Sequence, residues 1–193
     1  MGWTFGNLHV RKESGIDTQR VMREIEAIYG EFGFVSCQEE NAEMRLALVS
    51  GENSAWVSVY ADEFEEPQER ESLGMPLARK LHSPVLDIGC FDSDVLGLIL
   101  YDPDEDEPAQ AATGFMAEEM GISLINEDGW RRIVPDLAAF CSKIRAEHVL
   151  AEHALIELAE DLDLPDRYAR ADLQSLEQYA EQMPAEWLYL SRG

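Results

Sequence analysis

Two closely spaced aspartates, Asp92 and Asp94, are the residues of this sequence whose types and spacing come closest to a chemical motif. They follow the apolar run Pro84–Phe91, and an Asp-x-Asp pair after a strand can present two oxygen ligands to a divalent cation. With Asp87, they define one hypothesis, a divalent-metal-dependent enzyme that uses a carboxylate cluster. However, the next apolar run begins at Val95, which leaves no loop for a nucleotide, and Asp and Ser favour hairpin turns. We therefore favour a turn over a metal site.

Asp87 stands in the middle of an apolar run. A buried carboxylate would have a raised pKa and would suggest a functional site. We expect instead that this face of the sheet is partly open to water at Asp87.

Other arrangements of possible ligands do not fit known sites. Asp102, Asp104 and Asp106 have the rhythm of an EF-hand loop, but Glu107 and Thr113 stand where that loop needs a glycine and a bidentate acid. His148 and His153 are five residues apart, whereas two histidines on one helix face are four apart. No GxSxG or GxxxxGK[ST] motif is present. We expect no metal, cofactor or catalytic residue.

Charge is the strongest compositional signal. The 193 residues contain 39 acidic and 15 basic residues, a net charge of −24, which argues against a nucleic-acid partner because phosphate neutralisation dominates that affinity. Residues 36–115 hold 18 acids and only four bases. If two predicted hairpins are equivalent in the sheet, nine of these carboxylates line one acidic rim, which is solvated or meets a cationic partner. They are Asp62, Glu63, Glu65, Glu66, Asp102, Asp104, Glu105, Asp106 and Glu107.

Hydrophobic periodicity predicts the elements that would carry these residues. A strand is expected within Trp3–Arg11, and a helix follows Asp17, with Ile16 and Val21 as a hydrophobic staple. The segments Met44–Asp62 and Pro84–Asp102 share a pattern of apolar arms around a polar turn, so each predicts a hairpin. A helix precedes each hairpin, and Pro76 should kink or divide the second helix. Val95–Tyr101 lacks polar side chains, which predicts a central strand covered on both faces.

The remaining segments predict one more strand and a set of helices. Ala109–Phe115 is expected to add a strand, residues 116–193 to be mainly helical, and Ala185–Gly193 to be a final edge strand. We expect a single α+β domain over residues 1–193, with a mostly antiparallel sheet of two helix-plus-hairpin units in residues 1–115 and C-terminal helices packed on it.

Cysteine usage and the N-terminus indicate the compartment. Cys37, Cys90 and Cys141 are odd in number and far apart, which is typical of small buried residues in a reducing environment. Neither a signal peptide nor an apolar run of membrane-spanning length is visible. We expect a cytoplasmic protein without membrane contact.

The segment from Pro84, with PVL, FDSDVL and LYD in succession, resembles a hairpin of uncharacterised bacterial proteins. The resemblance covers about a tenth of the chain and implies no activity. Small acidic bacterial proteins include immunity and antitoxin proteins that neutralise basic toxins, and this chain is similar to them in character. We expect a non-enzymatic interaction protein with an acidic surface for a basic protein partner. The alternatives are the metal-dependent enzyme and a subunit of a homo-oligomer.

Overall fold

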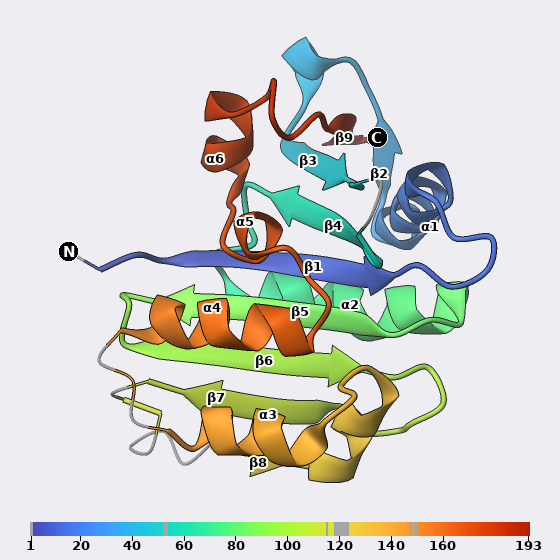
Figure 1. Ribbon diagram of the computed structural model, residues 1–193. Helices are drawn as coiled ribbons and strands as arrows, with labels where there is room; N and C mark the ends of the chain where they lie inside the picture. Colours follow the sequence, from blue (N-terminus) through green and yellow to red (C-terminus); the bar gives the residue numbers. More distant parts are fainter. Residues whose placement is uncertain (1, 52–53, 115, 118–123, 147, 149) are drawn as a thin grey trace.

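One antiparallel sheet forms the centre of the computed structural model, which describes residues 2–51, 54–114, 116–117, 124–146, 148 and 150–193 (Figure 1). The strand order is β2-β9-β3-β4-β1-β5-β6-β7-β8. Every pairing within the described residues is antiparallel. The strands are β1 Phe5–Arg11, β2 Phe34–Ser36, β3 Met44–Val49, β4 Trp56–Ala61, β5 Val85–Phe91, β6 Val95–Tyr101, β7 Ala109–Thr113, β8 Leu124–Ile125 and β9 Glu186–Arg192.

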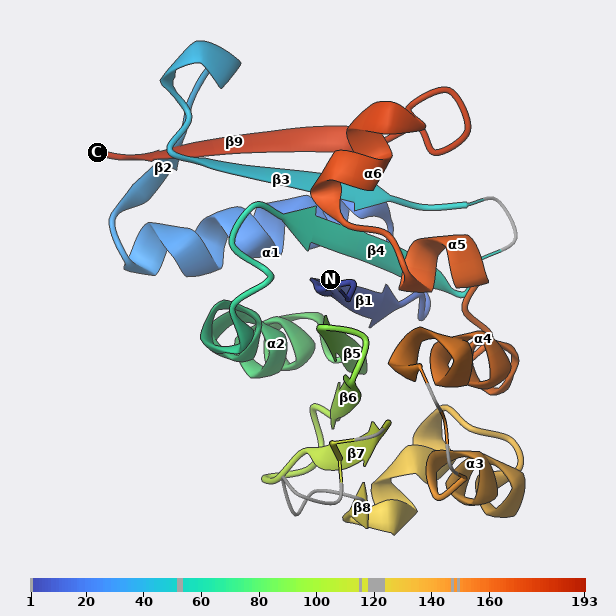
Figure 2. The same cartoon turned by 90° about the vertical axis from the view of Figure 1, so that its left-hand side faces the viewer.

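Helices cover the sheet on both faces (Figure 2). Helices α1, Thr18–Glu31, and α2, Pro67–Leu81, lie on one face and share its core with residues such as Leu8, Leu46 and Val59. The other face packs against α3, Leu137–Ile144, α4, Ala151–Asp161, α5, Asp166–Ala169, α6, Leu173–Gln178, and the 3-10 helix η2, Glu127–Arg132. A short 3-10 helix η1, Glu39–Asn41, precedes β3. The predicted α+β class, with an antiparallel sheet and C-terminal helices, is confirmed. No helix in the described part of the chain has the length and apolar character needed to cross a bilayer.

Local sequence accounts for the first two helices. Asp17 caps α1 by accepting a hydrogen bond from the backbone N–H of Arg20, and Ile16 and Val21 are both buried as the predicted staple requires. Helix α2 begins at Pro67, where a proline needs no hydrogen-bond donor. The expected division at Pro76 is wrong, because α2 is one continuous helix through that residue.

Strand β1 lies between the two predicted hairpins, β3–β4 and β5–β6. It pairs with the second strand of one hairpin and the first strand of the other. Because all these pairings are antiparallel, β4 runs opposite to β1, whereas β6 runs in the same direction as β1. The two hairpins therefore point their second strands toward opposite ends of the sheet. The same order corrects the expectation for the last strand: β9 is not an edge strand, since it lies between β2 and β3.

Strand β6 is fully covered on only one face. Leu96, Leu98 and Leu100 are buried against the C-terminal helices, but Val95 and Ile99 on the opposite face are half-buried. The expectation of complete cover on both faces is therefore wrong for β6. Complete cover on both faces is found instead in β1 and β4, where six consecutive residues of each strand are buried.

Candidate functional site: two acidic segments

The nine predicted rim carboxylates form two separate groups rather than one rim. Asp62, Glu63, Glu65 and Glu66, the first acidic segment, follow β4, whereas Asp102, Asp104, Glu105, Asp106 and Glu107, the second acidic segment, follow β6. Since β4 and β6 run in opposite directions, the two segments leave opposite ends of the sheet (Figure 1). The expectation of a shared rim is therefore wrong, because β1 lies between the hairpins and reverses one relative to the other.

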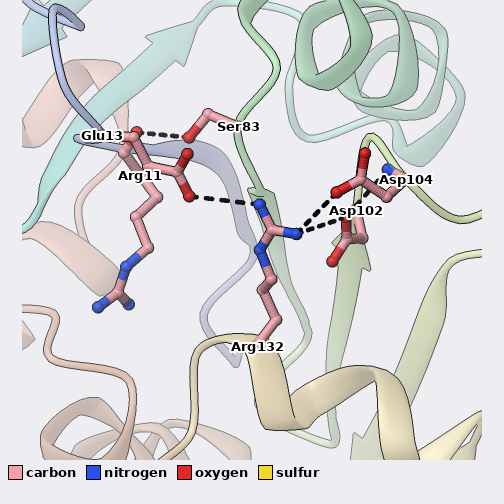
Figure 3. Close-up of polar contacts among 6 residues, drawn as sticks. All are labelled: Arg11, Glu13, Ser83, Asp102, Asp104 and Arg132. Atoms are coloured by element: carbon pink, nitrogen blue, oxygen red, sulfur yellow. Dashed lines mark hydrogen bonds and ion pairs between the residues drawn. The ribbon is translucent and has the colours of Figure 1, made fainter.

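An arginine of η2 anchors the start of the second acidic segment (Figure 3). Arg132 Nη1 lies 2.9 Å from Asp104 Oδ2 and 3.4 Å from Asp102 Oδ1, while its Nη2 lies 3.4 Å from Glu13 Oε1. Asp102 is buried, and its Oδ1 also accepts the Asp104 backbone N–H at 3.0 Å. One guanidinium thus joins the ends of β1 and β6 and offsets part of the local negative charge.

Arg45 has the same role for the first acidic segment. It forms a bidentate pair with Asp62, with Nε at 2.9 Å and Nη2 at 2.8 Å from the two carboxylate oxygens. Its Nη1 lies 2.7 Å from Oε1 of Glu177, which belongs to the last turn of α6. In each hairpin, therefore, the closing aspartate of the repeated pattern is held by an arginine. The sequence places Arg45 on the partner strand of that hairpin, but no sequence signal links Arg132 to Asp102.

The carboxylates that follow each anchored aspartate are different. Within the described residues, six of them form neither an ion pair nor a side-chain hydrogen bond, and all six are exposed. Exposed carboxylates at this density repel one another, and a cation from outside the chain would relieve that repulsion. The six are Glu63, Glu65, Glu66, Glu105, Asp106 and Glu107.

Asp92, Ser93 and Asp94 form the turn between β5 and β6, as the sequence predicts. Asp92 and Ser93 have positive φ values of 47° and 60°, a conformation that Asp tolerates better than most residues. Asp92 Oδ1 accepts the Gly2 N–H at 2.7 Å, and Ser93 Oγ accepts the Trp3 N–H at 2.7 Å. The turn thus holds the residues before β1 against the end of the sheet.

Asp87 is enclosed rather than open to water, so the expectation of a partly wet face is wrong. Its carboxylate is 2% exposed and its Oδ1 lies 2.6 Å from Nε of Arg70, which projects from α2. Burial raises the pKa of Asp87 to about 6, although the Arg70 guanidinium opposes that rise. Because Asp87 faces α2 and is paired there, the structure does not bring it to Asp92 and Asp94. No group of three His, Cys, Asp or Glu residues suited to a metal ion occurs among the described residues.

A Ser–His–Asn arrangement lies across β4 and β1, but it is sealed in the core. His9 Nδ1 is 2.8 Å from Ser58 Oγ and its Nε2 is 2.7 Å from Asn7 Oδ1. All three side chains have no exposed surface, and burial lowers the pKa of His9 to about 3. Asn7 Nδ2 donates in turn to the backbone oxygens of Ala169 and Ala171, at 2.9 Å each. The chain of hydrogen bonds fixes the end of α5 on the sheet and offers no access to a substrate.

A small cleft of about 250 Å³ beside α5 and α6 has two arginines, Arg167 and Arg170, among its lining residues. Both have partners within the chain: Arg170 forms an ion pair with Asp166, and Arg167 lies 4.9 Å from the centre of the Tyr168 ring. The cleft is a cationic spot on an acidic chain, and no sequence pattern predicts it.

Comparison of the chain with protein-family models, curated proteins and solved structures gives no match. The geometry and charge of its own residues therefore carry the functional argument.

Proposed function

We propose that this chain is a non-enzymatic interaction protein that acts in the cytoplasm and binds a basic protein partner through an acidic surface, in the manner of an immunity or antitoxin protein. The observation that supports this proposal is a set of six exposed carboxylates in the two acidic segments that pair with none of the described residues. The net charge of −24 adds a long-range attraction for any basic protein.

Unpaired surface carboxylates contribute little to folding. Exposed charges that have partners contribute less than about 1 kcal/mol each, and exposed like charges are unfavourable. Their physical effect lies in association, because complementary charge accelerates encounter with a partner and this acceleration fades as salt screens it. A role in binding is therefore the function that these segments are best suited to perform.

The opposite positions of the two segments allow a matched experiment. A basic partner is isolated with the wild-type chain as bait, and its association rate is then measured across a range of salt concentrations. One variant carries Glu63→Gln, Glu65→Gln and Glu66→Gln, and the other carries Glu105→Gln, Asp106→Asn and Glu107→Gln. Each removes three charges, so their effects on net charge are equal.

We expect both variants to fold as the wild type does, since the substituted side chains are exposed. The variant altered on the partner-facing segment should associate more slowly and should lose most of its dependence on salt, while the other variant should change little. Two unchanged rates with the wild-type salt dependence, or a partner without a basic surface, would contradict the proposal.

The competing hypothesis is a divalent-metal-dependent enzyme that uses Asp87, Asp92 and Asp94. No arrangement of these residues favours it, because Asp87 is paired with Arg70 beneath α2 and Asp92 accepts a hydrogen bond from Gly2.

A further inference from the structure

A pocket of about 470 Å³ lies between helices α1 and α2 and reaches strands β2, β3 and β9. Its walls are mostly apolar, with Ile28 and Phe32 from the α1 side, Leu73 from α2, and Phe34 and Met44 from the strands. Phe32 is 67% exposed, so its ring offers apolar surface at this pocket. The volume falls within the range of about 300–1,000 Å³ that is typical of ligand pockets.

Two unpaired carboxylates line the same pocket. Glu63 belongs to the first acidic segment, and Glu69 lies in the first turn of α2. Neither forms an ion pair with another residue in the part of the chain that is described. Burial, followed by the charges of Glu69 and Asp62, raises the pKa of Glu63. Burial, followed by the charges of Glu69 and Glu63, raises the pKa of Tyr29. The two carboxylates therefore act on one another and on the pocket wall, where a cation would stabilise them.

Helix α1 adds further negative potential, because it ends beside the pocket. Its last turn contains no basic residue, so the partial negative charge of its C-terminal carbonyls is not offset within that turn. The cation already present, Arg192, lies 5.6 Å from the centre of the Phe34 ring and forms no ion pair with a described carboxylate. An aromatic wall of this pocket thus already stacks against one guanidinium.

We propose that this pocket receives an arginine side chain of the basic protein partner, with its methylene stem against the exposed ring of Phe32 and its guanidinium against Glu63 and Glu69. This inference rests on the proposed function and assigns the first acidic segment as the partner-facing one. An arginine fits because its stem is apolar, its head is cationic, and its planar fork both stacks on aromatic rings and pairs with carboxylates. Glu65 and Glu66 extend the negative surface beyond the pocket, which suits a partner with several cations better than a small organic cation.

The test uses the full chain and a fluorescent synthetic peptide in which leucine and arginine alternate. A matched peptide carries citrulline, a neutral analogue of similar shape, in place of every arginine. The variant Glu63→Gln/Glu69→Gln removes the pocket charges. Its control, Glu105→Gln/Glu107→Gln, removes two charges from exposed residues at the opposite end of the sheet. Methyl NMR signals of Ile28, Met44 and Leu73 report whether the peptide enters the pocket.

We expect the pocket variant to weaken binding by about tenfold or more, because the arginine loses its charge-assisted hydrogen bonds to both carboxylates. The control should weaken binding by no more than about threefold. The methyl signals of the pocket should shift with the arginine peptide and not with the citrulline peptide. Arg192→Gln should strengthen binding, because Arg192 is a cation in the pocket wall that competes for the same space.

The two failures are distinguishable. Equal weakening by both glutamine pairs, or binding without any shift of the pocket methyl signals, would overturn the pocket assignment while leaving an acidic binding surface in place. An arginine peptide that binds no more tightly than its citrulline counterpart would count against the proposed function itself.

Discussion

Arg70 and Asp87 form an ion pair over 2.6 Å beneath helix α2, where the two side chains are only 6% and 2% exposed. Arg70 also donates to the backbone oxygen of Phe64, which leads into α2. Two glycines leave the space that this guanidinium needs, because a side chain at Gly6 or Gly89 would collide with it. The pair thus joins α2 to β5 in the centre of one core.

Removing one member of this pair should be more harmful than removing both. Arg70→Met leaves a carboxylate buried without its partner, so the free energy of unfolding should fall by about 3–5 kcal/mol. The double variant Arg70→Met/Asp87→Leu removes both charges and should be less destabilised than the single variant. Urea unfolding at neutral pH measures both. An equal or greater fall in the free energy of unfolding of the double variant would show that the ion pair stabilises the fold by more than its burial destabilises it.

His9 should make stability depend on pH. Its pKa is about 3 in the folded chain and about 6.5 in an unfolded one, so only the unfolded chain takes up this proton between those values. Folding should therefore lose stability as pH falls below about 6.5, by up to about 1.4 kcal/mol per pH unit. His9 is hydrogen-bonded to Ser58 and Asn7, and the Tyr60 ring lies 6.4 Å away in a T-shaped arrangement; none of these three groups is charged near neutral pH.

The variant His9→Gln isolates this effect. The glutamine retains polar atoms but cannot take up a proton. The free energy of unfolding of the variant, relative to that of the wild type, should therefore rise as pH decreases from 7 to 5. Asp87, whose raised pKa acts in the opposite sense, is present in both chains and cancels in the comparison. Parallel stability curves for the two proteins would mean that His9 is protonated in the folded chain or not enclosed.

Truncating a side chain of β6 should lower stability by different amounts on the two faces of the strand. Leu98 has no exposed surface, so Leu98→Ala should lower the free energy of unfolding by about 2–5 kcal/mol. Ile99 points to the other face and is half-buried, so Ile99→Ala should cost less, about 1–2 kcal/mol. Urea melts of both variants test this difference. A cost below about 1 kcal/mol for Leu98→Ala, or equal costs at both positions, would be inconsistent with the described packing.

The β5–β6 turn should not bind divalent metals strongly. Asp92 already accepts the Gly2 N–H, and the described residues contain no group of three His, Cys, Asp or Glu suited to a metal ion. Calorimetry with Mg²⁺, Mn²⁺ or Ca²⁺ should therefore show no affinity tighter than about 1 mM, the weak end of calcium sites. A micromolar site that disappears in Asp94→Ala would restore the metal-dependent enzyme as the better hypothesis.

Local pattern was sufficient to predict most elements of the fold. Asp17 and Ile16 mark the start of α1, and the alternation of Trp56, Ser58 and Tyr60 places these side chains on one face of β4, where all three are buried. These features depend on neighbouring residues, so a short stretch of sequence contains them. The prediction that the cysteines are buried holds for Cys90 and Cys141, whereas Cys37 is half-buried.

The order of the strands and the contacts between distant elements could not be predicted from the local sequence pattern. The shared rim required the two hairpins to lie in the same orientation, and the position of β1 between β4 and β5 reverses one of them. Asp87 appeared suited to a wet face because its partner, Arg70, belongs to a different element. The pocket between α1 and α2 combines five separate elements and their connections, so no single segment predicts it.

The place of β9 constrains the order in which the sheet is completed during synthesis. This strand fills the position between β2 and β3, so these two strands lack their shared neighbour until residue 192 has left the ribosome. Until then, β2 lacks β9, its strand partner among the described residues, and the outer edge of β3 is open to pairing with another chain. A chain shortened before Glu186 should therefore associate with itself or require a chaperone, even though both hairpins and β1 are already present.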